Sequence, residues 1–122
     1  MPLKNMLTGY LNLFLSDKYS IIRDAFLEYP DIIGGDGRLE TKIMSSSDNI
    51  IAKCGAGGIC IVVNTKLSDA FIVKIMDCNM QAREAVVLEM LKKLEWCDIP
   101  YDNQIKTLHG ETVGYIDVSL DL

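Results

Sequence analysis

Residues 59–63 read Ile-Cys-Ile-Val-Val, so every side chain is apolar whichever face of an extended strand it occupies. A strand that is apolar on both faces is typical of the centre of a sheet covered on both sides. Further largely apolar runs lie at 50–53 and 70–76, and a short segment joins each of them to the run at 59–63. Short connections favour antiparallel pairing. The sequence therefore predicts an antiparallel sheet of three or four strands with residues 59–63 at its centre.

Helices are expected before this sheet. Apolar residues recur every three or four positions over residues 7–14 and again over 22–29, which predicts two amphipathic helices joined by a tight turn. Pro30 should end the second of them. Residues 39–44 suit a short third helix, and a polar cluster separates it from the first strand.

One long helix is expected after the sheet, capped by Asp77 or Asn79. The spacing predicts a buried stripe of Val87, Met90, Leu91 and Leu94, with Arg83, Glu84, Glu89, Lys92 and Lys93 facing water. A last strand is predicted at 113–118. The predicted fold class is α+β: two amino-terminal helices, the antiparallel sheet and one long covering helix, in a single domain of residues 1–122.

Composition limits the classes of function. The chain has 122 residues and a net charge of −5, which fits one domain and disfavours general nucleic-acid binding, since that requires many Lys and Arg residues. No apolar run approaches the ~20 residues of a membrane span. The amino end lacks the long apolar region of a secretion signal. We therefore expect a cytoplasmic protein that binds neither nucleic acid nor membranes.

The cysteines predict no metal site. Cys54, Cys60, Cys78 and Cys97 form no Cys-x-x-Cys pair, and His109 is the only histidine. Zinc sites in proteins usually include two ligands at short spacing. The sequence instead favours reduced thiols that serve as small apolar side chains in the core.

Lys53 is the strongest candidate for chemistry, because it ends an apolar run and precedes the glycine-rich residues 55–58. Desolvation there would lower the lysine pKa, and Lys53 would then act as a base for a serine hydroxyl or as a local charge that activates it. The alternative is a surface cation at the sheet edge. Truncation of Lys53 is expected to affect activity and to leave folding nearly unchanged.

Other polar residues carry weaker signals. Lys74 interrupts an apolar strand face and is expected to pair with Asp77. The glycines of residues 34–37, followed by Arg38, predict either a turn or a cradle of backbone N–H groups for an anion. His109 is expected to lie exposed in a turn. No serine stands three residues before any lysine, and no nucleophile elbow is present. The chain therefore holds at most half of a serine–lysine active site.

Three stretches resemble the bacterial L-asparaginase II family, the thermolabile Rhizobium-type group: Tyr-Pro-Asp-Ile-Ile-Gly-Gly-Asp-Gly-Arg at 29–38, Ala-Lys-Cys-Gly-Ala-Gly-Gly at 52–58, and Val-Lys-Ile-Met-Asp-Cys-Asn at 73–79. Residues 2–5 and 110–116 also fit, in the same order and with short gaps, so the resemblance covers nearly the whole chain. Two positions depart from it: Gly57 stands where the family has Glu, and Cys78 where it has Gly.

The resemblance implies hydrolysis of L-asparagine to L-aspartate and ammonia, on a fold similar to serine β-lactamases and glutaminases. Lys53 matches a catalytic lysine of that family, one member of its two serine–lysine pairs. The glycine-rich stretches allow close approach of a substrate to the backbone, and the implied substrate-binding residues are Gly35, Gly37, Arg38, Gly55 and Ala56.

The family's nucleophilic serines and its zinc ligands lie upstream of the part that this chain resembles. The resemblance therefore implies a carboxyl-terminal portion that holds no cofactor of its own, is inactive alone, and works with a separately encoded amino-terminal half. Without that half, exposed apolar surface is expected to make the chain a homo-oligomer. The alternatives are a pseudoenzyme or interaction module that kept the fold and lost catalysis, and a structural domain without a ligand.

Overall fold

The computed structural model describes all 122 residues and has the α+β architecture that the sequence predicts. The helices are α1 (Leu3–Leu15), the 3-10 turn η1 (Asp17–Tyr19), α2 (Ser20–Glu28), α3 (Pro30–Gly34), α4 (Leu39–Ser45) and α5 (Met80–Lys93). The strands are β1 (Ile50–Gly55), β2 (Ile59–Asn64), β3 (Asp69–Lys74), β4 (Gln104–Lys106) and β5 (Thr112–Tyr115). None of the helices combines the length and the apolar character that crossing a lipid bilayer requires.

The main sheet has the order β1-β2-β3, with both pairs antiparallel. The central place predicted for residues 59–63 is confirmed, and four of these five side chains are buried. The Lys53 position faces Ile61 across the β1–β2 pair, and Cys54 faces Cys60. Because β1 is an edge strand, a long side chain on it can reach around the edge of the sheet.

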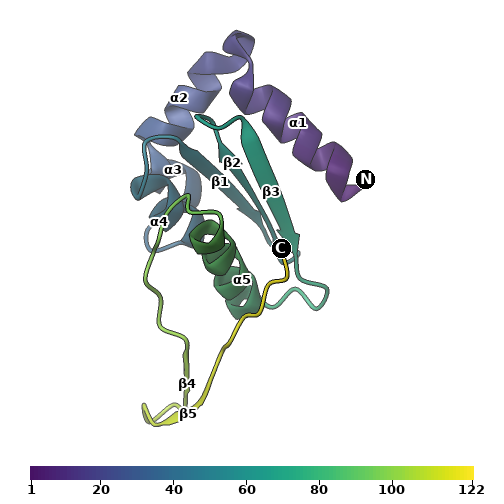
Figure 1. Cartoon of the computed structure of the whole chain (residues 1–122). Coiled ribbons are helices and arrows are strands. Elements are labelled where there is room, and N and C mark those ends of the chain that lie inside the picture. The colour runs from purple at the N-terminus through teal and green to yellow at the C-terminus, as the bar shows by residue number, and fades with distance from the viewer.

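Helices cover both faces of the main sheet, with α1 on one side and α5 on the other (Figure 1). Phe14 of α1 is buried, and its ring meets that of Phe26 of α2 edge-on at 4.9 Å between centroids. On the opposite face, Val87 of α5 is fully buried in the same apolar core as Val62. The two amino-terminal helices and the long covering helix are thus confirmed.

Pro30 does end α2, as expected, but it also begins another helix. Pro30 is the first residue of α3, a position where proline's missing N–H costs no hydrogen bond and its fixed φ already suits a helix. The chain therefore continues as a short helical turn toward the glycine-rich residues 34–37.

The predicted last strand does not join the main sheet. β5 pairs with β4, which the sequence did not indicate, in a separate two-stranded sheet that lies apart from the core (Figure 1). Its two large apolar side chains, Val113 and Tyr115, stay 65% and 67% exposed. Because these side chains stay in water, the two-stranded sheet adds little apolar burial to the core.

Candidate functional site

One end of β1 borders a cavity of about 290 Å³. Three parts of the chain meet there: the segment from the end of α3 to the start of α4, the end of β1 with the following turn, and the first turn of α5. The lining residues are Gly34, Arg38, Glu40, Lys53, Cys54, Gly55, Ala56, Met80 and Arg83. Three cationic side chains and one carboxylate thus line a small hollow bordered by glycine backbone, an arrangement suited to a small anionic or zwitterionic molecule.

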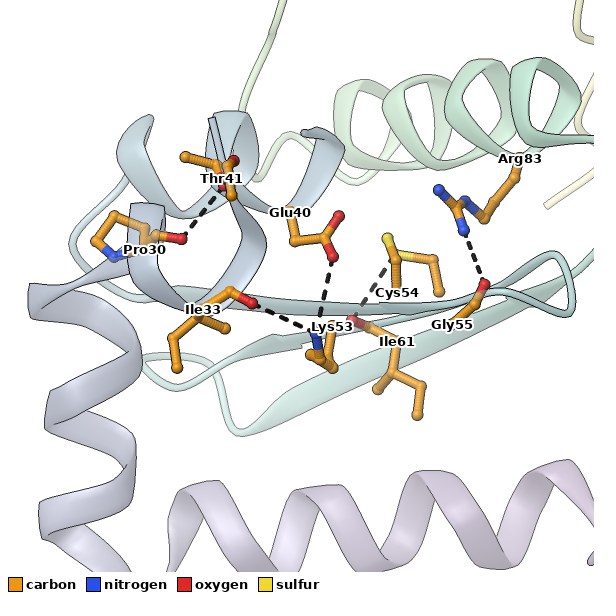
Figure 2. A network of polar contacts seen from close by, with 11 residues as sticks. Pro30, Ile33, Glu40, Thr41, Lys53, Cys54, Gly55, Ile61 and Arg83 are labelled. Atoms are coloured by element: carbon orange, nitrogen blue, oxygen red, sulfur yellow. Dashed lines mark hydrogen bonds and ion pairs between the residues drawn. The ribbon is translucent and has the colours of Figure 1, made fainter. Parts of the chain in front are cut away.

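Lys53 lines this cavity from β1. Figure 2 shows its side chain directed toward Glu40 and the backbone of Ile33. Its Nζ lies 3.8 Å from Oε1 of Glu40 and donates to the carbonyl oxygen of Ile33 over 3.5 Å. The Lys53 side chain is 37% exposed, whereas that of Glu40 is only 10% exposed. The cation is therefore held by a buried carboxylate and a backbone oxygen, while part of it stays open to a ligand.

Glu40 is a site residue that the sequence analysis missed. It stands in the first turn of α4, where a carboxylate is favoured by the positive end of the helix dipole. The helix is held in place by Thr41, whose Oγ1 donates to the carbonyl oxygens of Gly35 (2.6 Å) and Pro30 (3.2 Å). Because the rest of α4, a turn and the first half of β1 separate Glu40 from Lys53, no local pattern pairs them.

The glycine-rich segment before α4 works as a turn. Gly35 and Gly37 have φ values of +91° and +67°, which L side chains rarely adopt. Neither residue lines the cavity, whereas Gly34 and Arg38 do. Of the five substrate-binding residues expected from the resemblance, Arg38, Gly55 and Ala56 are therefore brought together around Lys53.

Arg83 does not face water as predicted, because it is only 5% exposed. Its Nη1 donates to the carbonyl oxygen of Gly55 over 3.0 Å, and its Nε is buried without a partner (Figure 2). The signal was present in the sequence, because Arg83 lies four and eight residues before the buried Val87 and Leu91. The prediction followed residue type, and the helical period was the better guide.

Two cysteine thiols meet beside Lys53. Sγ of Cys54 donates to Sγ of Cys60 over 3.1 Å; Cys60 is fully buried, and Cys54 lines the cavity. The hydrogen bond with Cys54 and burial raise the pKa of the Cys60 thiol well above its usual range. All four cysteines are free, as expected. The predicted core position is fully confirmed only for Cys60. Cys54 and Cys97 are half-buried, and Cys78 is exposed.

Lys74 forms no ion pair with Asp77, contrary to the prediction. Its Nζ donates to the carbonyl oxygens of Gly57 (2.6 Å) and Ile75 (2.8 Å). The Asp77 carboxylate instead accepts from the backbone N–H of Asn79, whose own side chain caps α5. Lys74 thus ties the β1–β2 turn to the end of β3, which is a structural role. His109 is exposed, as predicted.

A family model described as L-asparaginase II matches residues 1–117. The chain belongs to the L-asparaginase II family. No curated protein is similar enough to this sequence to give a match. The three stretches that carry the resemblance meet at the cavity: the first contributes Gly34 and Arg38, the second contributes residues 53–56, and the third leads directly into Met80 and Arg83.

The fold explains one departure from the family pattern. Cys78, which stands where the L-asparaginase II family has glycine, has a φ of +61°. This left-handed conformation is the one that glycine adopts without steric cost. The chain keeps the turn that leads into α5 although it has lost the residue best suited to it.

No three His, Cys, Asp or Glu side chains are grouped so that they could hold a metal ion.

Proposed function

We propose that this chain forms the lysine-bearing side of an L-asparagine amidohydrolase site, which releases ammonia and L-aspartate. The observation that carries the proposal is the position of Lys53. Its ammonium group, paired with Glu40, opens onto a cavity that also contains two guanidinium groups, in a member of the L-asparaginase II family.

The lining suits an amino-acid substrate. An α-carboxylate is bound best by a guanidinium, which can form two parallel charge-assisted hydrogen bonds. Arg38 is the cavity's accessible guanidinium. Arg83 adds a buried positive charge to the cavity wall, with its Nη1 donating to the carbonyl oxygen of Gly55. The backbone at Gly55 and Ala56 leaves room for close approach of the substrate.

The nucleophile would come from polypeptide outside these 122 residues, because no serine lines the cavity and no Ser-x-x-Lys is present. A lysine held against a carboxylate acts most directly through its positive charge. Lys53 would stabilise the negative charge that develops when the serine hydroxyl loses its proton. One preorganised donor of this kind contributes about 10²–10³ in rate. Glu40 would orient the ammonium group.

Exposed apolar side chains on α2 and α3 suit the packing of that serine-bearing polypeptide. Ile21 of α2 and Ile32 of α3 remain 79% and 76% exposed, and Tyr29, between the two helices, is 48% exposed. Exposed apolar side chains of this size favour association. If the serine-bearing polypeptide is absent, a second copy of the chain would cover this surface, and light scattering would detect the resulting homo-oligomer.

The test combines this chain with the amino-terminal part of an L-asparaginase II enzyme, supplied as a separate polypeptide, and measures ammonia release from L-asparagine. The isolated chain should release none. The reconstituted pair should be active, and Lys53→Ala should lower its turnover about 100-fold or more. Lys66→Ala is the matched control, because Lys66 lies exposed in the β2–β3 turn, away from the cavity.

The ion pair between Lys53 and Glu40 changes the expectation that truncating Lys53 leaves folding nearly unchanged. Lys53→Ala would leave the buried Glu40 carboxylate unpaired, at a cost of about 1–2 kcal/mol, between the values typical of exposed and buried pairs. The double variant Lys53→Ala/Glu40→Gln removes that cost, so it separates folding from catalysis. Full turnover in this folded double variant would refute the catalytic role of Lys53. A stable complex without any turnover would favour a non-catalytic binding module.

A further inference from the structure

Cys54 and Cys60 face each other across the β1–β2 pair, in a position that permits a covalent bond. The backbone N–H of Thr65 donates to the carbonyl oxygen of Asn49, so these two residues form a hydrogen-bonded pair next to the first β1–β2 partners. Hydrogen-bonded and non-hydrogen-bonded pairs alternate along an antiparallel ladder. Counting along the register makes Cys54–Cys60 a non-hydrogen-bonded pair.

This type of pair suits a disulfide without movement of the strands. Its Cα atoms lie about 4.5 Å apart, within the range of about 4.4–6.8 Å that disulfides require. The two sulfurs already lie 3.1 Å apart. Neither Cys78, in the turn before α5, nor Cys97, beyond its end, has another thiol in hydrogen-bond contact.

The two thiols differ in access. Cys54 lines the cavity, whereas Cys60 is fully buried beneath it. The hydrogen bond with Cys54 and burial raise the pKa of the Cys60 thiol. The buried positive charge of Arg83 opposes this rise but is the smaller effect. Cys54 is therefore the thiol that an oxidant can reach, and Cys60 is the buried partner that retains its proton.

We propose that Cys54 and Cys60 form a reversible oxidation site, in which a hydroperoxide that enters the cavity converts the two thiols to a cross-strand disulfide. Sulfur of Cys54 attacks the peroxide: an S–O bond forms, the O–O bond breaks, and the proton of the thiol leaves with the first water. Sulfur of Cys60 then attacks sulfur of Cys54: the S–S bond forms, the S–O bond breaks, and the proton of Cys60 leaves with the second water. Two thiols and one hydrogen peroxide thus give one disulfide and two waters.

Oxidation at this place would act on the cavity directly. The disulfide closes a ring around the turn that contains Gly55 and Ala56, both of which line the cavity, and it lies next to Lys53. The ring stiffens the backbone that borders the ligand and removes a thiol from the cavity wall. The site requires only the reduced chain and a peroxide, so the proposal does not rest on the amidohydrolase function.

The test uses the full 122-residue chain and its Cys78→Ser/Cys97→Ser variant, which keeps only the proposed pair. After treatment with an equimolar amount of hydrogen peroxide, free thiols are titrated and the intact mass is measured. Wild type should fall from four free thiols to two, and the double variant from two to none. On denaturing, non-reducing electrophoresis both should run as single chains without a cross-link, with a mass lower by two hydrogen atoms. Dithiothreitol should reverse the change.

Single replacements in the two-thiol variant test the order of events. Cys60→Ser should leave Cys54 as a sulfenic acid that dimedone traps, whereas Cys54→Ser should leave the buried Cys60 unreacted. Peptide mapping of oxidised wild type makes the test independent of whether the variants fold. A disulfide through Cys78 or Cys97, a cross-link between chains, or four thiols that survive peroxide would each overturn the proposal.

Discussion

Replacing Gly58 by alanine should destabilise the fold strongly, because this glycine is packed against backbone. Its φ is +69°, a conformation that costs an L residue about 1–2 kcal/mol. A Cβ there would lie 2.7 Å from Cα of Cys78 and 2.9 Å from the carbonyl oxygen of Ile75. Neither backbone atom can move aside without disturbing the bond that the N–H of Ile75 donates to the Gly58 carbonyl oxygen over 2.9 Å. Loss of that bond adds about 0.5–1.5 kcal/mol.

Together these costs amount to about 1.5–3.5 kcal/mol for Gly58→Ala. With a denaturant slope of about 2 kcal/mol/M in urea, the unfolding midpoint should fall by about 1–2 M, measured by circular dichroism at the helical band. Gly57→Ala is the matched control, because a Cβ at Gly57 meets nothing within 4 Å and its φ lies outside the left-handed region. It should change stability by no more than about 0.5 kcal/mol. Equal midpoints for the two variants would refute the steric argument.

Two further predictions concern positions outside the cavity. Cys78→Gly should raise the free energy of unfolding by about 0.5–1 kcal/mol, because φ at Cys78 is +61°; a loss of stability in a urea titration would contradict this. The backbone N–H of Gln104 and then the Lys106 ammonium lower the pKa of Asp102, so the folded chain binds this proton less tightly than the unfolded chain. The resulting stability is present above the ordinary aspartate pKa and is lost as pH falls through the lowered value. An NMR titration should show the lowered pKa, only partly restored by Lys106→Met, and a titration at the ordinary value would exclude it.

Much of the fold could be predicted because each strong pattern is local. The doubly apolar run at 59–63 required cover on both faces, and α1 and α5 provide that cover. The long helix was expected with its cap. The Oδ1 of Asn79 accepts a hydrogen bond from the backbone N–H of Ala82 over 2.9 Å, as such a cap requires. The last strand forms at 112–115, but its partner β4 could not be predicted, because alternation indicates an extended conformation and says nothing about which strand pairs with it.

Half of the candidate site could be predicted, and the reason is visible in the side chains concerned. Lys53 stood out because a cation ended an apolar strand before glycines. Its partner Glu40 carried no signal, because a glutamate in the first turn of a helix is ordinary. Arg83 carried a misleading one, because an arginine is rarely buried and its residue type outweighed the helical period.

By itself, the sequence determined the antiparallel β1–β2–β3 sheet, its covering helices and the exposed turn at His109, because burial periodicity and short connections act over a few residues. Only the tertiary structure decided that α4 brings Glu40 to Lys53, that α5 brings Arg83 to Gly55, and that Cys54 and Cys60 touch. A periodic pattern shows that a side chain is buried but not what lies against it. The partner depends on where distant elements pack on the sheet, and that is fixed by the packing of the whole core.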